Sequence, residues 1–470
     1  MQTPVSTLPG PRPAPVLGVY GNFIAFLRKP LAYMHHLHQT YGDMVTLAEG
    51  TTDYIFAFSP AYNELLLNDT THFYNLDASS MPIQVPEESA LARLFTGLIQ
   101  MNGERHKQQR RLMLPAFHRQ RVASYRDDIV RLTEQMLTTW EVGQPRDLYQ
   151  DMRKLTLAVA VKTLLGLDPA REGEGVQRLL EQWINRVFSI PALLFPIPMP
   201  GLPYYRLLRL SEQLVAEIRS LIRRKRAGSD DQGDVLTMLM QAHDEDGTRL
   251  TENELLGQTN FLFMAGHATT TSALSWTLFL LAQHPAIMAD LLDELEEVLH
   301  GSAPSVAQLA ALPLLEGVIQ ESLRLFPPVL WWSRICVDSC LFGPYEIPAG
   351  ARVVYSAYIT HRLPDLYPRP NAFLPKRWLT MNPAPYAYVP FSSGPRMCLG
   401  GTFAMMEMKV VLAMLLQRYR LSLQPGARVD HGGLMLSIPR PGLPMVVHAQ
   451  DRQFTHSPVQ GIIGALGDLT

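Results

Sequence analysis

Cysteine, net charge and sequence repeats are all scarce in this chain of 470 residues, and each scarcity excludes a class of protein. The three cysteines, Cys336, Cys340 and Cys398, are too few and too clustered for a disulfide framework, which fits the reducing cytoplasm. The formal net charge of −2 argues against nucleic acid as a partner. Because no repeat or linker divides the chain and 47% of it is hydrophobic, we expect one domain over residues 1–470, with flexible ends at about 1–8 and 450–470.

Long uninterrupted apolar runs are also missing. The N-terminus lacks the basic and apolar regions of a signal peptide. The most apolar stretch, FLFMAGHATTTSALSWTLFLLA, contains His267, four threonines and two serines, which is typical of a buried helix and not of a membrane span. A soluble protein is therefore expected. The apolar, proline-rich loop Ser189–Tyr205 is expected over a cavity mouth or against a membrane surface, which is compatible with a transient membrane contact.

Helical periodicity dominates the stretches Tyr125–Ile222 and Asp234–Leu325. Thr251 and Glu254 match a capping box, which predicts the start of a long helix that runs to about His284. At about 1.5 Å per residue this helix would be about 50 Å long.

A second helix, LEGVIQESLRLF, is predicted to end before Pro327. The charged segment Arg223–Gly233 is predicted to be a loop. The alternating segments DMVTLAEG, YEIPAGARVVYSAYITH and GLPMVVHA carry turn signals that suggest hairpins. The predicted fold class is mainly α with a small β region.

Cys398 lies in FSSGPRMCLG, whose glycine, proline and serine residues suit neither a helix nor a plain strand. A catalytic thiol would need a base that the sequence does not nominate, and a zinc site would need nearby Cys or His ligands that are absent. A plain buried cysteine is the simplest alternative. A haem thiolate ligand is the fourth, because Gly394 and Gly400 let the backbone approach a flat macrocycle, Arg396 can reach a propionate, and a following helix would direct its dipole at the thiolate.

This loop resembles the Phe-x-x-Gly-x-Arg-x-Cys-x-Gly pattern of the cytochrome P-450 superfamily. All five fixed positions match, namely Phe391, Gly394, Arg396, Cys398 and Gly400. The resemblance extends from about Leu8 to about His448. It implies the P-450 fold, with a long central helix over a haem b, and it makes Cys398 the ligand of the iron.

Other segments resemble the same family. Glu321 and Arg324 match its Glu-x-x-Arg and share one helix face, and Arg377 in FLPKRW would complete a buried cluster that holds the frame. The resemblance implies that further residues contact the haem propionates, namely His106 and Arg110 in GERHKQQRRLMLPAF, Arg334 after PPVLWW, and His361 in ITHRLPDLYPRPN. The alternative for His106 and Arg110 is a basic, solvated helix face.

The segment AGHATTT resembles the family's Ala-Gly-x-Asp/Glu-Thr-Thr. The small Ala265 would let the haem face approach the helix, and the Thr269 hydroxyl would assist oxygen activation. The acidic position of the family is Ala268 here. His267 is adjacent but lies about 100° around the helix. Thr269, Thr270 and His267 are the predicted catalytic residues. Alternatively the substrate supplies a polar group, or the enzyme uses peroxide or an oxygenated substrate.

The pocket that the resemblance implies is mainly apolar. It would be lined by Leu91–Met101, the Ser189–Tyr205 loop, Phe261, Leu262, Ala265, Val329, Leu330, Trp331, Trp332 and Leu436. For the aromatic residues the alternative is ordinary core packing. A medium-to-large hydrophobic substrate is expected, such as a fatty acid, terpenoid or polyketide, to be hydroxylated or epoxidised with O₂.

Electrons must come from another protein, because the chain has no flavin or iron–sulfur motif. A ferredoxin or flavodoxin with its NAD(P)H-dependent reductase is the expected donor. It would dock on a basic cluster, defined as Arg105, Lys107, Arg110, Arg111, Arg119 and Arg121. Two alternatives to the monooxygenase stay open. One is a peroxygenase or rearrangement enzyme, motivated by Ala268, and the other is a haem-binding sensor without turnover.

Overall fold

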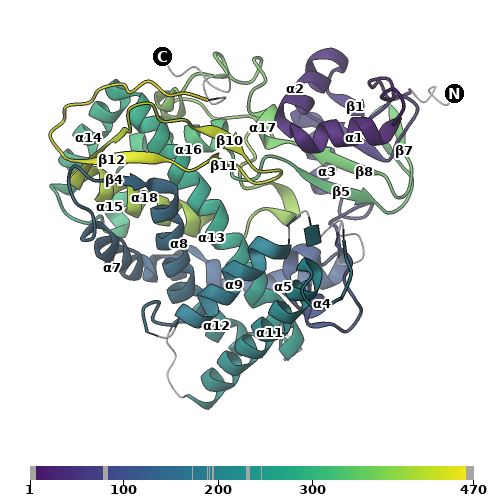
Figure 1. Cartoon of the computed structure of the whole chain (residues 1–470), viewed down its shortest axis with the longest axis horizontal. Coiled ribbons are helices and arrows are strands. Elements are labelled where there is room, and N and C mark those ends of the chain that lie inside the picture. Colours follow the sequence, from purple (N-terminus) through teal and green to yellow (C-terminus); the bar gives the residue numbers. More distant parts are fainter. Residues whose placement is uncertain are drawn as a thin grey trace. The chain divides into compact units, whose positions relative to one another are not determined.

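The computed structural model describes residues 7–77, 83–171, 173–187, 189, 191–192, 195–228, 233–244 and 246–461 (Figure 1). The outermost parts of the two ends predicted to be flexible, 1–6 and 462–470, lie outside the described residues. The chain divides into two compact units: unit 1 is Met1–Tyr74, Thr133–Met152 and Thr269–Thr470, and unit 2 is Asn75–Leu132 and Arg153–Ala268. The single domain of the sequence analysis stays a prediction.

Helices make up most of the regular secondary structure in both units, which confirms the predicted fold class. Those of unit 1 are α1 (Val19–Arg28), α2 (Pro30–Tyr41), α3 (Pro60–Asn68), α14 (Pro285–Leu299), α15 (Val306–Ala310), α16 (Pro313–Leu325), α17 (Ala357–Thr360) and α18 (Gly401–Arg418), with 3₁₀ turns η4 (Pro375–Leu379) and η5 (Gly394–Arg396). Those of unit 2 are α4 (Ala90–Leu94), η2 (Leu98–Gln100), α5 (Gly103–Met113), η3 (Leu114–Phe117), α6 (Arg119–Ser124), α9 (Glu174–Val187), α11 (Pro203–Ala227) and α12 (Val235–Gln241). Residues of both units occur in α7 (Arg126–Leu137), α8 (Leu148–Leu165) and α13 (Glu252–Gln283).

The long helix α13 begins and ends where the sequence predicts. The Thr251 N–H donates to the Glu254 carboxylate at 2.9 Å, and the Glu254 N–H donates to the Thr251 hydroxyl at 3.3 Å. These two bonds form the predicted capping box. The helix stops at Gln283, and Pro285 opens α14, because proline is tolerated only in the first turn. Every residue of α13 is α-helical. Among the described residues, no helix combines the length and apolar composition that crossing a membrane requires.

The largest sheet is buried on both faces. Its strand order is β1 (Met44–Thr46), β2 (Tyr54–Ala57), β8 (Arg352–Tyr355), β5 (Trp332–Cys336) and β3 (Phe73–Tyr74), with β2 and β8 parallel and the other pairs antiparallel. Phe56 and Val354 belong to a core cluster that includes residues of α1 and α2, whereas Ile55 and Val353 belong to a second cluster. Since neighbouring side chains point to opposite faces, both faces need apolar residues, which explains the continuous apolar runs.

The hairpin prediction is only partly right. β1 and β2 form an antiparallel hairpin, and β12 (Pro444–Ala449) pairs with β9 (Tyr419–Leu423) and β4 (Pro145–Asp147). The segment YEIPAGARVVYSAYITH is not a hairpin: β7 (Tyr345–Ile347) pairs with β6 (Cys340–Phe342), whereas β8 joins the large sheet and SAYITH turns into α17. The remaining strands, β10 (Asp430–Gly432) and β11 (Ile438–Arg440), form an antiparallel pair.

Both predicted loops are shorter than expected, because α11 extends into each of them. It begins at Pro203 and continues to Ala227, with Leu214, Ile218 and Leu221 buried along one face. In the part of the apolar loop that precedes α11, Phe195 and Met199 expose 60% and 59% of their surface. The sequence favours a position of this loop over a cavity mouth or against a membrane surface. What it contacts stays a prediction.

Candidate haem-thiolate site

The loop that carries Cys398 has a fixed backbone. The Cys398 N–H donates to the Phe391 carbonyl at 2.8 Å, and the Met397 N–H donates to the Gly394 carbonyl at 3.0 Å. Gly394 has a φ of 68°, and a β-carbon there would lie 2.7 Å from the Asn68 Oδ1 atom of α3. Glycine is therefore required at this turn, because the loop packs directly against the end of α3.

Cys398 itself is exposed and comes just before the N-terminus of α18, which starts after Gly400. The Gly400 carbonyl accepts the Ala404 N–H at 2.9 Å, so the first turn of this helix is formed. A β-carbon at Gly400 would have nothing within 4 Å, which leaves room for a flat group beside the sulfur. A helix N-terminus stabilises a negative charge, so this position favours the thiolate.

Arg334 independently indicates a binding site for an anion. It lies on β5 with 3% of its surface exposed, and its Nε and Nη1 atoms have no hydrogen-bond partner among the described residues. Burial lowers its pKa from the ordinary value. A buried guanidinium without an anion is costly, and a haem propionate is an anion of the required kind. Arg396 is half-buried two residues before the cysteine in the same unit. These residues fit the predicted cofactor.

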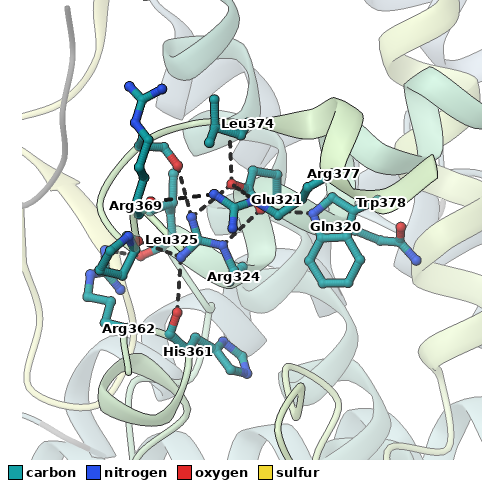
Figure 2. Close-up of polar contacts among 12 residues, drawn as sticks. Gln320, Glu321, Arg324, Leu325, His361, Arg362, Arg369, Leu374, Arg377 and Trp378 are labelled. Carbon is teal, nitrogen blue, oxygen red and sulfur yellow. Dashed lines mark hydrogen bonds and ion pairs between the residues drawn. The ribbon is translucent and has the colours of Figure 1, made fainter. Parts of the chain in front are cut away.

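Glu321 and Arg324 form the fully buried pair that the sequence predicts (Figure 2). The Arg324 Nε and Nη2 atoms donate to the two Glu321 carboxylate oxygens, each at 2.8 Å. Arg377 completes the cluster, with its Nε atom 3.2 Å from Glu321 Oε1. The i and i+3 positions place both partners on one face of α16, and the two parallel bonds fix their orientation.

The cluster binds two further segments to α16 (Figure 2). Glu321 also accepts the Leu374 N–H at 3.0 Å and the Trp378 indole N–H at 2.8 Å. Arg324 donates to the backbone carbonyls of residues 361, 370 and 372 at 2.6–3.0 Å. One guanidinium thus satisfies three backbone carbonyls between residues 361 and 372. In this way the cluster fixes that segment against α16.

His361 belongs to this frame. It is fully buried, its Nε2 atom accepts the Val389 N–H at 2.8 Å, and its carbonyl accepts Arg324. Burial and the two nearby arginines, Arg324 and Arg362, lower its pKa to about 3. Because the Nε2 atom accepts a backbone N–H, the ring proton lies on Nδ1, which has no hydrogen-bond partner among the described residues. The propionate contact of His361 stays a prediction.

The central part of α13 carries the predicted oxygen-side residues. Within unit 2, Ala265 is half-buried, and a β-carbon at Gly266 would meet only Leu164 Cδ1, at 3.9 Å. His267 is buried, and burial, together with the nearby Arg153 charge, lowers its pKa to about 4, so the imidazole is neutral near pH 7. Within unit 1, Thr269 is half-buried and Thr270 is buried. Their catalytic roles stay predictions.

His106 and Arg110 lie one turn apart on α5 of unit 2. His106 is buried and Arg110 is half-buried, so they do not form the fully solvated face of the alternative interpretation. The outward face of the same helix carries Arg105 and Arg111.

Comparison with known proteins decides the family. The family model for cytochrome P450 matches residues 8–442. The chain belongs to the cytochrome P450 family. It is 32% identical over 427 residues to cyclooctatin synthase and 31% identical over 455 residues to cyclooctat-9-en-7-ol 5-monooxygenase, both of Streptomyces melanosporofaciens. These alignments cover 88% and 95% of this chain and 90% and 96% of the relatives. The solved structure of retinoic acid-bound cyanobacterial CYP120A1 matches with a TM-score of 0.80 at 28% identity, over 95% of this chain and all of that one.

This P450 is a haem monooxygenase, which confirms the predicted family, fold, enzyme class and haem cofactor. P450 monooxygenases use O₂, a substrate and a redox partner. A haem sensor without turnover is thereby set aside.

Two of the residues predicted to line the substrate pocket are core residues. Leu330 is fully buried, and Trp331 packs against Phe26 of α1 with ring centroids 5.2 Å apart and donates to the Leu434 carbonyl at 2.9 Å. Their side chains therefore fill the cluster beneath α1 and α2. Val329 and Leu436 are half-buried and joined by a β-bridge.

For the other residues predicted to line the pocket, a contact with substrate stays a prediction. Trp332 is half-buried on β5 of unit 1. In unit 2, Phe261 is half-buried against Gly97, whereas Leu262 is buried.

Sequence reasoning missed the anchor of the 433–437 turn in unit 1. Ser272 of α13 donates to the Ser437 carbonyl, and the Ser437 hydroxyl lies 2.8 Å from His431 Nε2. The His431 ring stacks on Trp276 with centroids 5.7 Å apart. This network holds the turn that presents Leu436. No signal in the sequence could have revealed this network, because its α13 residues lie more than 150 positions before its residues in the turn.

Proposed function

We propose that this P450 uses O₂ to hydroxylate or epoxidise a medium-to-large hydrophobic substrate such as a fatty acid, terpenoid or polyketide. The observation that carries the proposal is an exposed Cys398 just before α18, in the same unit as a buried Arg334 whose Nε and Nη1 atoms have no hydrogen-bond partner among the described residues. One similar protein is named for cyclooctat-9-en-7-ol, and a similar solved structure holds retinoic acid; both compounds are largely hydrocarbon with one polar group. They support a substrate of that kind here.

The proposed cofactor form is haem b, which when bound would accept electrons and activate O₂. Cys398 would hold the iron, with the thiolate charge stabilised by the α18 dipole. Arg334 and Arg396 would hold propionates by charge-assisted hydrogen bonds. His106 and Arg110 are proposed for the same role. We also place the protein in the cytoplasm, since three clustered cysteines are too few for a disulfide framework.

Isotope labelling tests this function against the peroxide-dependent alternative. The holoenzyme, a competent ferredoxin and reductase, and hydrophobic candidate compounds are incubated under ¹⁸O₂. The expected result is a product that contains one ¹⁸O atom and forms only when the donor is present. Product that forms with added peroxide but never with O₂ and the donor would instead establish the peroxygenase that Ala268 motivates.

Thr269 is proposed to donate a hydrogen bond to bound oxygen and to direct protons toward it. Thr269→Ala should lower product formed per electron by about 100-fold, the lower end of the range for positioned proton transfer. Hydrogen peroxide release should rise by the matching amount, while the rate of NAD(P)H consumption changes little. Thr269→Ser, which keeps the hydroxyl, is the matched control and should retain most of the coupling. Equal coupling in wild type and Thr269→Ala would remove Thr269 from the catalytic residues.

The proposed electron donor is an acidic ferredoxin or flavodoxin that docks on the basic cluster of α5 and α6. Arg111 and Arg119 are exposed and have no ion-pair partner among the described residues, whereas Arg105 and Lys107 are paired with Glu254 and Glu104. Unpaired surface arginines are free to attract an acidic partner.

Changing Arg111 and Arg119 together to Glu should slow reduction by the donor by about tenfold at low ionic strength. The difference should shrink at high salt, because screening removes the attraction. Stopped-flow reduction of the holoenzyme measures both rates. Arg209→Glu, on the exposed face of α11, is the control and should reduce at the wild-type rate. If the double variant is reduced as fast as wild type, the donor docks elsewhere.

A further inference from the structure

We propose that Cys336 and Cys340 form a disulfide when the protein meets peroxide, with Cys340 as the thiol that is oxidised first and Cys336 as the thiol that resolves it. Cys336 is the last residue of β5, and Cys340 is the first residue of β6. Their Sγ atoms lie 3.8 Å apart in unit 1. Nothing in the proposed monooxygenase reaction uses either thiol, so this inference is independent of that function.

The two sulfur atoms can reach bonding distance without moving the strands. A disulfide needs its sulfur atoms about 2.05 Å apart, so they must approach by less than 2 Å. The Cys336 N–H donates to the Ala351 carbonyl at 2.8 Å, and Cys340 pairs with Ile347 in the β6–β7 hairpin. Of the three connecting residues, Val337 is held by its N–H bond to the His72 carbonyl at 2.8 Å, whereas Asp338 and Ser339 are exposed. Side-chain rotation and this short turn can therefore supply the approach.

The two thiols differ in access to solvent, and this difference assigns their roles. Cys336 is fully buried, whereas Cys340 is half-buried. Peroxide in solution therefore reaches Cys340. A metal is not the alternative here, because the described residues contain no group of three or more suitable ligands.

The proposed reaction consumes one hydrogen peroxide per pair. The Cys340 sulfur attacks one peroxide oxygen, the O–O bond breaks, and a sulfenic acid and one water form. The Cys336 sulfur then attacks the Cys340 sulfur, which breaks its S–O bond, forms the S–S bond and releases a second water. Two thiols are oxidised to one disulfide and one peroxide is reduced to two waters.

Burial makes this reaction slow, so it does not serve to remove peroxide. Its effect is to protect Cys340 from irreversible oxidation. Burial raises the pKa of both thiols, that of Cys336 to about 12, and few molecules carry a thiolate near neutral pH. Once Cys340 is a sulfenic acid, however, a neighbouring thiol decides its fate. The disulfide can be reduced again, whereas further oxidation to a sulfinic acid is irreversible without a dedicated repair enzyme. The pair thus preserves β5, the strand that also carries Arg334.

Peptide mass spectrometry tests the proposal on the purified holoprotein. Trypsin releases residues 335–352, which contain both thiols, and separates them from Cys398 because Arg334 and Arg352 are the flanking cleavage sites. The protein is treated with excess hydrogen peroxide, unfolded in iodoacetamide and digested. The expected wild-type peptide is unlabelled and lighter by two hydrogen atoms, and reduction should restore two alkylation sites.

Two serine variants separate the roles of the thiols. Cys336→Ser should accumulate Cys340 as sulfinic or sulfonic acid at least several-fold faster than wild type. Cys340→Ser should keep Cys336 as a thiol that alkylates only after unfolding. The proposal is overturned if the wild-type peptide stays doubly alkylated, if it crosslinks between chains, or if Cys340 reaches the sulfinic acid equally fast with and without Cys336.

Discussion

Cys398→Ser is expected to abolish monooxygenase activity and the ferrous carbonyl band of a thiolate-ligated haem. The physical reason is the acidity of the ligand. A thiol has a pKa near 8.5 and forms a thiolate at a helix N-terminus, whereas a serine hydroxyl stays protonated at any physiological pH. The loss of activity should exceed the roughly 10²–10³-fold effect of removing one preorganised charge-stabilising group. Carbon monoxide difference spectra and product formation under ¹⁸O₂ measure the two effects.

Cys340→Ser is the matched control for this variant, because it makes the same atomic change at a partly buried position of the same unit. Its carbonyl band and activity should match those of wild type. A full thiolate-type band in Cys398→Ser, or loss of the band in both variants, would show that Cys398 is not the ligand. The exposed position of Cys398 means that the substitution itself should cost little stability, so loss of haem signals can be assigned to loss of the sulfur.

The parts of the site that the sequence predicted are those that depend on short spacings. Three features each need only neighbours within ten positions of the chain. They are the Phe391–Gly400 loop, the pair at Glu321 and Arg324, and the capping box at Thr251. Such spacings fix backbone geometry locally, whatever the rest of the chain does. Gly394 illustrates the reasoning, because its positive φ could be expected from the loop, although its packing against Asn68 could not.

The failures share one cause, which is contact between distant segments. Trp331 was predicted to line a pocket, yet its ring is covered by Phe26, some 300 positions earlier. The bonds of His361 to Val389 and Arg324 likewise join segments far apart in the chain and were not predicted. The strands β7 and β8 have the alternation of a hairpin but join different sheets. A period of apolar residues shows that a face is buried and does not show what buries it.

Trp378 is a further partner of the Glu321 carboxylate that the sequence analysis overlooked beside Arg377. Both residues stand in FLPKRW, and both contact the Glu321 carboxylate (Figure 2). A carboxylate has four acceptor positions, and a fully buried one must have most of them filled. Two arginines do not fill them all in this geometry, so a further donor was to be expected near Arg377, and the indole N–H provides it.

Arg324→Met should destabilise this P450 by about 3–5 kcal/mol, the range for breaking one partner out of a buried ion pair. The variant leaves the Glu321 carboxylate without its two strongest bonds, and it removes the donor for backbone carbonyls between 361 and 372. Arg324→Lys keeps the charge but has no fork to satisfy two carboxylate oxygens at once, so it should show an intermediate loss. The urea midpoint and the fraction of purified protein that retains haem measure the effect.

Arg418→Met provides the comparison that separates a buried cluster from an ordinary ion pair. Arg418 also donates to a carboxylate at 2.8 Å, that of Glu134 in the same unit, but both side chains are more than 40% exposed. Exposed pairs contribute about 0–1 kcal/mol, since water and salt screen them. If Arg418→Met and Arg324→Met shift the urea midpoint equally, burial does not set the strength of the Glu321 cluster. A large shift in Arg324→Met alone would instead show that this single guanidinium holds the segment 361–372 against α16.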